Sequence, residues 1–172
     1  MRDIAPIVER LSRCRAGLEA SLNAFTPETW RKAPGSGRWS AAEVIAHVSM
    51  VEDKITSTAE KLIRGEPRPL FLLKRVHIPV ALVKWRGVKR KSPIPLDPAL
   101  LKGKEEMLAS LTALRRRSIA LLEKNRERDL SAYCWRHPFF GYLNYYTWFK
   151  VMALHEIRHT KQIREIVDSF HR

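Results

Sequence analysis

Cysteine is scarce in this chain: two of its 172 residues are cysteine, Cys14 and Cys134, and they form no CxxC pair. The simplest interpretation is a reduced, cytoplasmic setting in which both thiols are structural. Long apolar runs are also missing, and none approaches the roughly 20 residues that span a bilayer. The first residues lack the apolar segment of a signal peptide. We therefore expect a protein without a membrane span.

Acidic residues are few relative to basic ones. The sequence has 18 Asp and Glu against 32 Lys and Arg, a formal net charge of +14. Such an excess is compatible with nucleic acid, an anionic membrane surface or an acidic ligand. Part of it falls in two clusters, 84–91 and Arg115-Arg116-Arg117, and neither carries the interleaved aromatic residues of a single-strand binding platform. We expect mostly solvated helix faces and loops here, and no specific nucleic-acid partner.

The strict alternation of apolar and polar residues that marks a β-strand is absent too. Apolar residues instead recur at three- and four-residue steps, which predicts helices. The second helix has the clearest start, because Ser40-Ala41-Ala42-Glu43 is a capping box and Trp39 can pack onto Val44. Four helices are predicted: about residues 3–24, 40–65, from the Asp97-Pro98 cap to about 125, and 144–169.

The connections between these helices differ in length. Six of the ten prolines fall from Pro67 to Pro98, so residues 66–97 are expected to form a long crossover with a short helix near 71–84. Residues 126–141 are expected to form an aromatic-rich loop. Four amphipathic helices with one long crossover between the second and third describe an all-α four-helix bundle. With 172 residues, the chain is expected to be a single domain, 1–172.

Two histidines on the last predicted helix are the most informative residues. His155 and His159 are four residues apart, so both imidazoles project from the same helix face. That face is otherwise apolar, and buried imidazoles are costly unless they are hydrogen-bonded or bound to something. A divalent metal is the usual solution, because neutral imidazole is its commonest protein ligand.

A third histidine, His47, lies on the apolar face of the second helix, between Val44 and Val51. A single inward histidine is more often a hydrogen-bonded core residue than a ligand. Three inward histidines on two helices of one bundle favour a metal site, since such sites are assembled from facing helices. Three imidazoles with an open fourth position match a catalytic site of the zinc type.

The run from His155 to His159 also fits the HExxH pattern of zinc proteases, in which the glutamate is the general base. Arg158 places a charge between the two histidines, and no downstream segment offers the usual third ligand. Glu156 lies about 100° around the helix from His155, which favours an outer-shell or surface position. The protease interpretation is therefore the weaker one.

Three segments resemble the DinB-like proteins. The first is residues 39–48, with the pattern W-S-x-x-E-x-x-x-H that ends at His47. The second is His137-Pro138-Phe139-Phe140-Gly141, which is followed by Thr147-Trp148, and the third is H-x-x-R-H-x-x-Q-I from His155 to Ile163. Their order along the chain is that of the family.

This resemblance implies an up-down-down-up four-helix bundle with nickel or zinc held by His47, His155 and His159. It also implies a homodimer that acts on a small-molecule substrate, either as a metal-dependent hydrolase or as an S-transferase that uses a low-molecular-weight thiol. DNA binding does not follow from it. The long, basic, proline-rich crossover departs from the family pattern, so it bears on the shape of the pocket.

Two further residues are candidates for a catalytic role. Arg158 and Gln162, on either side of His159, could support the ligands from the outer shell or hold an anionic substrate. Surface or interhelical hydrogen bonds are the alternative for both. For the whole chain, the alternative to an enzyme is a non-catalytic binding module with a structural or absent metal, whose basic surface engages an acidic partner.

Overall fold

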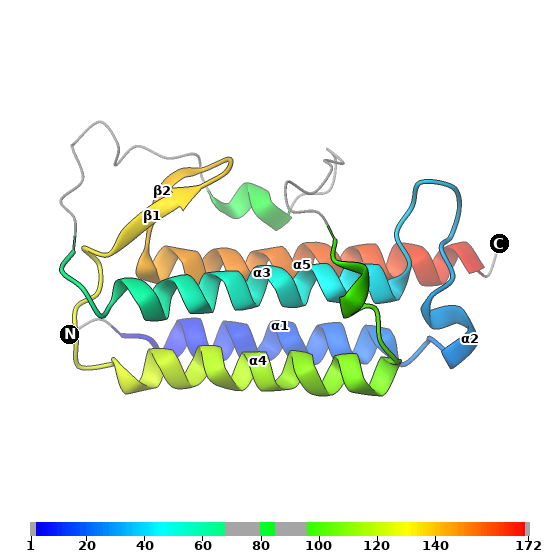
Figure 1. Cartoon of the computed structure of the whole chain (residues 1–172), viewed down its shortest axis with the longest axis horizontal. Coiled ribbons are helices and arrows are strands. Elements are labelled where there is room, and N and C mark those ends of the chain that lie inside the picture. Colours follow the sequence, from blue (N-terminus) through cyan, green and yellow to red (C-terminus); the bar gives the residue numbers. More distant parts are fainter. Residues whose placement is uncertain (1–2, 68–79, 85–95, 171–172) are drawn as a thin grey trace.

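The computed structural model describes residues 3–67, 80–84 and 96–170. This part of the chain is mostly helical, which confirms the expected class. Four long helices dominate it (Figure 1): α1 (Ala5–Leu22), α3 (Ala41–Leu62), α4 (Lys104–Lys124) and α5 (Tyr145–Phe170). The short helix α2 (Pro27–Trp30) lies between α1 and α3 in the chain.

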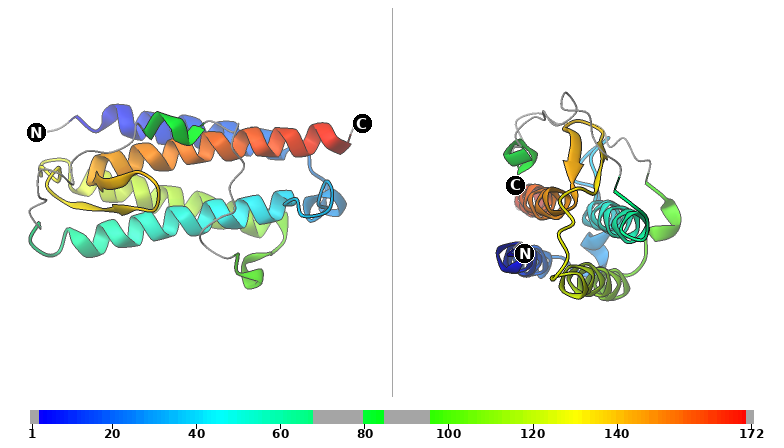
Figure 2. Two further views of the ribbon diagram at one scale, coloured as in Figure 1. Left: turned by 90° about the horizontal axis from the view of Figure 1, so that it is seen from above. Right: turned by 90° about the vertical axis from the view of Figure 1, so that its left-hand side faces the viewer.

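The long helices pack around one central axis. Seen end-on in Figure 2, they occupy the four corners of a square, and α5 is flanked by α1 and α3. Helix α4 occupies the fourth corner and packs against α3 and α1. The histidine-bearing helices α3 and α5 are therefore neighbours, as a shared site requires.

The predicted start of α3 is confirmed in detail. The Ser40 amide donates to Oε2 of Glu43 at 2.8 Å, and the Glu43 amide donates to Oγ of Ser40 at 3.3 Å. Together they satisfy amide groups that the first turn of a helix leaves without partners. The helix ends at Leu62, three residues before the expected Gly65.

The predicted cap of the third long helix is wrong. Asp97 and Pro98 begin only a 3-10 helix, η3 (Pro98–Leu100), and α4 starts at Lys104 after Gly103. Tertiary contacts hold the intervening segment outside the helix. Trp30 Nε1 donates to the carbonyl oxygen of Lys102 at 3.2 Å, and Arg31 donates to that of Leu101 at 2.8 Å.

The expectation that no strand is present is also wrong. Within the predicted loop 126–141 and just after it, β1 (Cys134–His137) pairs in antiparallel fashion with β2 (Gly141–Asn144). Each strand has four residues, too few to show alternation in the sequence. Gly141 has a φ of 75°, a left-handed conformation that glycine adopts without strain where the turn ends.

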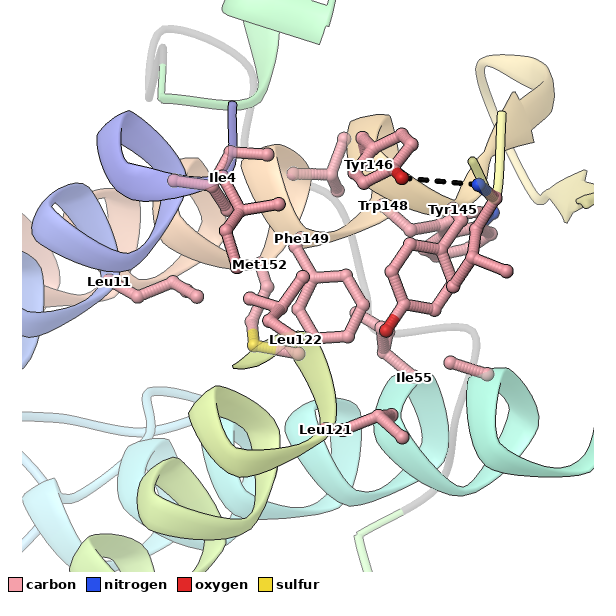
Figure 3. Close-up of a cluster of buried hydrophobic side chains, with 14 of the residues drawn as sticks. Ile4, Leu11, Ile55, Leu121, Leu122, Tyr145, Tyr146, Trp148, Phe149 and Met152 are labelled. Atoms are coloured by element: carbon pink, nitrogen blue, oxygen red, sulfur yellow. Dashed lines mark hydrogen bonds between the residues drawn. The ribbon is translucent and has the colours of Figure 1, made fainter. Parts of the chain in front are cut away.

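The apolar interior is divided into two clusters. One, shown in Figure 3, surrounds Phe149 and Leu122 near the start of α5. The other surrounds Leu111 and Ile163 toward the opposite end of the bundle. Polar and charged residues that are nevertheless buried lie on the same helix stripes, including His47, His159 and Glu52. The bundle therefore contains polar groups at positions where continuous apolar packing would be expected.

Part of the predicted crossover lies outside the described residues, including most of the basic cluster 84–91. From the helix expected near 71–84, Val80–Lys84 is seen as a 3-10 helix, η2, which packs on α5. In the described residues, no helix has both the length and the apolar character needed to cross a membrane.

Candidate metal centre

The three predicted histidines lie together between α3 and α5. His47 comes from the second turn of α3 and is 6% exposed, and His159 on α5 is also 6% exposed. His155 is partly buried one turn before His159. The Trp39 ring covers His47, with the ring centroids 5.2 Å apart. The predicted grouping of these residues is therefore present in the structure.

The imidazole nitrogens point toward a common centre. Nε2 of His155 lies 3.1 Å from Nε2 of His47 and 3.1 Å from Nε2 of His159. One imidazole nitrogen carries either a single hydrogen or a single in-plane lone pair, so the two contacts of His155 would have to share it. Nitrogens bound at the usual length to one tetrahedral ion would be about 3.3 Å apart. The three side chains could hold a metal ion.

The protonation of these imidazoles suits ligation. Burial lowers the pKa of His47 from 6.5 to about 4. Burial also lowers the pKa of His155 to about 3, and the nearby charges of His47, Arg158 and His137 add to this effect. Both rings are consequently neutral near pH 7, with a lone pair available for a cation.

The two outer-shell candidates stand in different relations to the histidines. Oε1 of Gln162 lies 2.9 Å from Nδ1 of His159, so Gln162 holds this ring from the side opposite Nε2. Arg158 is half-buried, and its positive charge contributes to the low pKa of His155. The structure thus places Gln162 against a histidine and a positive charge, that of Arg158, near His155.

Glu156 does not act as the HExxH pattern would require. It is 1% exposed, and both of its carboxylate oxygens accept hydrogen bonds from arginines, Arg15 at 3.1 Å and Arg115. Its side chain is directed toward α1 and α4, away from the histidines. The expectation of an outer-shell or surface position is wrong. Glu156 can be buried away from the histidines because two buried arginines compensate its carboxylate charge.

Sequence reasoning missed the ion cluster to which Glu156 belongs. It contains Arg15, Glu52, Arg115 and Glu156, one from each long helix and none more than 5% exposed. Glu52 accepts from Arg15 at 2.7 Å and from Arg115 at 2.9 Å. The signal was present in the sequence, since each of these residues lies on the apolar stripe of its helix. The expectation that the cluster Arg115-Arg116-Arg117 lies on a solvated helix face is wrong for Arg115, which is buried.

The charges within the ion cluster balance, and each of its side-chain nitrogen and oxygen atoms has a hydrogen-bond partner. Arg15 and Arg115 each also donate to a backbone carbonyl, those of Leu111 and Leu11. Burial raises the pKa of Glu52, but the hydrogen bonds and charge of Arg115 and the charge of Arg15 lower it more, so the net shift is downward. The ion cluster fixes α5 against the other three helices directly beside His155.

One further histidine approaches this region from the β-hairpin. His137 ends β1, and its ring lies 5.0 Å from that of Trp148 and 4.7 Å from that of Phe140. Nδ1 of His137 accepts hydrogen bonds from the backbone amides of Phe139 at 3.1 Å and Phe140 at 3.3 Å. His137 therefore closes the turn of the hairpin.

Comparison with known families agrees with this geometry. The model of the DinB superfamily matches residues 10–163. This chain belongs to the DinB superfamily. The match includes all three histidines, the hairpin and the four residues of the ion cluster. The resemblance carried by the three sequence segments is thereby confirmed.

A bacterial relative extends over nearly the same length. The uncharacterized protein YuaE of Bacillus subtilis (strain 168) is 28% identical over 153 residues, covering 88% of this chain and 91% of that protein. The similarity runs through almost the whole of both chains. Its name assigns no reaction.

Proposed function

We propose that this DinB superfamily member is a metal-dependent enzyme that acts on a small molecule by hydrolysis or thiol S-transfer. His47, His155 and His159 hold one divalent ion, nickel or zinc. The observation that carries the proposal is the pair of 3.1 Å contacts that bring three Nε2 atoms together. Three neutral imidazoles leave a position for a further ligand, as in catalytic sites.

A divalent ion at this position supplies Lewis acidity and lowers the pKa of a water or thiol. The protein residues around it would do the rest. Gln162 accepts a hydrogen bond from Nδ1 of His159 and keeps Nε2 aimed at the centre. Arg158 adds the positive charge that attracts an anionic substrate or a thiolate to the site. We assign both residues to the catalytic machinery on this basis.

The proposal includes the finer features that the family implies. The four long helices form an up-down-down-up bundle whose crossover, 66–97, joins the second and third, in agreement with the helix directions in Figure 1. The chain forms one domain, 1–172, which works as a cytoplasmic homodimer. Light scattering coupled to gel filtration tests the dimer directly.

Metal content is the first experiment. Mass spectrometry on protein purified without a histidine tag should find about one nickel or zinc ion per chain. His47→Ala and His155→Ala should lose the ion and keep the helical circular dichroism of the wild type. Asp53→Ala, an exposed position on α3, serves as the matched control and should retain the ion.

The opposite result has a definite meaning. A wild-type protein that contains no metal and takes up neither added zinc nor added nickel contradicts the proposal. The histidines are then core residues, and the non-catalytic binding module becomes the better interpretation. If the ion is present, hydrolase and thiol-transferase substrates are screened with and without chelator, and loss of activity on chelation is the expected outcome.

A further inference from the structure

The tautomer of His137 is fixed by the hairpin. Because Nδ1 accepts hydrogen bonds from two backbone amides, it carries the lone pair and cannot carry a hydrogen. The hydrogen of the neutral ring is therefore on Nε2. The ring thus presents one hydrogen-bond donor, and its orientation is held by the turn that it closes.

The hairpin lies on the same side of the bundle as the three histidines. Glu156 points toward α1 and α4, and the adjacent His155 points about 100° away from it, toward α3. Figures 1 and 2 show the hairpin on the outer side of α3 and α5, away from α1 and α4, with its turn pointing along the bundle toward its mid-length. The hairpin therefore lies over α3 and α5, the two helices that carry the three histidines.

The contacts of His137 place it along the helix face that carries the metal centre. Its ring packs on that of Trp148, at a centroid distance of 5.0 Å. Trp148 is seven residues before His155, almost two helical turns, and so lies on the same face of α5. In agreement with this position, His137 is one of the groups whose charge influences the pKa of His155.

We propose that His137 is a non-ligating residue of the site, whose Nε2–H donates a hydrogen bond to an acceptor atom of the molecule bound beside the metal. The inference rests on the proposed function, because it needs an ion held by the three histidines. The molecule it recognises carries an anionic or carbonyl acceptor. Such a donor adds selectivity, since a molecule without the acceptor leaves the N–H unpaired.

A purely structural role in the turn is the competing explanation, and His137→Asn separates the two. The Oδ1 atom of asparagine can accept the same backbone hydrogen bonds that Nδ1 accepts, as in an Asx turn. It has no donor at the position of Nε2. His137→Ala removes both functions. Phe139→Ala is the matched control, because Phe139 belongs to the same turn and its side chain is 42% exposed.

Azide is a suitable probe, because it binds directly to cobalt(II) and its distal nitrogen accepts a hydrogen bond. The experiment loads the full-length chain with cobalt(II) and follows azide binding by the change in visible absorption. His137→Asn and His137→Ala should both weaken azide binding about tenfold or more, the range for a hydrogen bond to a charged group. The cobalt content should equal that of the wild type, and Phe139→Ala should bind azide normally.

Two results would overturn the inference while leaving the metal site intact. One is a cobalt-loaded His137→Asn protein that binds azide as tightly as the wild type. The other is an equal loss of azide affinity in Phe139→Ala, which would indicate a general effect of the hairpin. A wild-type protein that binds no cobalt would instead refute the proposed function, and the inference with it.

Discussion

Oε1 of Gln162 lies 2.9 Å from Nδ1 of His159, one turn earlier on the same helix. The amide oxygen is an acceptor, so this contact places the ring hydrogen on Nδ1 and the lone pair on Nε2. It therefore selects the tautomer that can bind a metal. Outer-shell partners of this kind commonly change metal affinity by 10–100-fold.

We expect Gln162→Leu to weaken metal binding by about 10- to 100-fold, because the ring loses its acceptor and the correct tautomer is no longer favoured. Competition with a chromophoric chelator measures the affinity. Gln162→Glu should retain most of it, since a carboxylate also accepts from Nδ1. The exposed neighbour Lys161→Ala is the control. Equal affinity in Gln162→Leu and the wild type would show that the contact has no role in tuning the metal.

The buried ion cluster leads to a prediction about stability. Glu52→Gln removes one negative charge from a group of two arginines and two glutamates and leaves buried positive charge without compensation. Breaking a buried pair in this way costs about 3–5 kcal/mol. The exposed pair between Arg117 and Glu60 gives the comparison, and Glu60→Gln should cost about 1 kcal/mol or less.

Urea unfolding followed by circular dichroism measures both variants. The two glutamates lie on the same helix and receive the same chemical change, so they differ in burial and partners. If Glu52→Gln were no more destabilising than Glu60→Gln, the ion cluster would not be contributing to the free energy of unfolding.

Much of the candidate metal centre could be predicted from the sequence because its geometry is local. The spacing of His155 and His159 determines that they share a helix face, and the capping box at Ser40 sets the start of α3 and so the direction of His47. The residues alone did not show that α3 and α5 face each other, and the family resemblance supplied this step. The predicted grouping of the histidines followed from these steps.

The remaining features depend on contacts between distant parts of the chain. An arginine at a core position reads as an exposed charge until its partners are known, and those of Arg115 are 63 and 41 residues away. The hairpin gave no signal because four-residue strands are too short for a visible period. Likewise, the late start of α4 depends on Trp30, which lies 72 residues from its acceptor.

The hairpin histidine predicts a pH dependence. Burial lowers the pKa of His137 from 6.5 to about 4. As the pH falls, His137 is therefore protonated near pH 6.5 in the unfolded chain but only near pH 4 in the folded chain. Stability contributed by this site is complete above pH 6.5 and is lost as the pH falls toward 4. Protonation of Nδ1 would also break its two bonds to the turn.

Metal-free wild type and His137→Asn should thus converge in stability between pH 7.5 and pH 4.5. Guanidinium unfolding midpoints of the two proteins are compared at several pH values. Asparagine does not titrate and all other titratable groups are common to both proteins, so the difference reports His137. Nitrogen NMR of labelled histidine reports the pKa itself. Parallel stability curves, or a His137 that titrates near 6.5, would contradict the assignment.

The adjacent residues Tyr145 and Tyr146 differ in the hydrogen bonding of their hydroxyl groups. Within the described residues, the hydroxyl of Tyr145 is buried and has no hydrogen-bond partner, and burial raises its pKa. The Tyr146 hydroxyl accepts from the Leu130 amide, as Figure 3 shows, and donates to the carbonyl oxygen of Arg128, both at 3.1 Å. The two residues share one apolar cluster but differ in how their hydroxyls are satisfied.

We expect Tyr145→Phe to leave the free energy of unfolding unchanged or to raise it by up to about 1 kcal/mol, because an unpaired polar atom leaves the core. Tyr146→Phe should lower it by about 1–3 kcal/mol, since the Leu130 amide then lacks a partner in the interior. Thermal and urea unfolding of both variants decide the matter. A loss in Tyr145→Phe as large as that in Tyr146→Phe would mean that an ordered water or another group satisfies the Tyr145 hydroxyl.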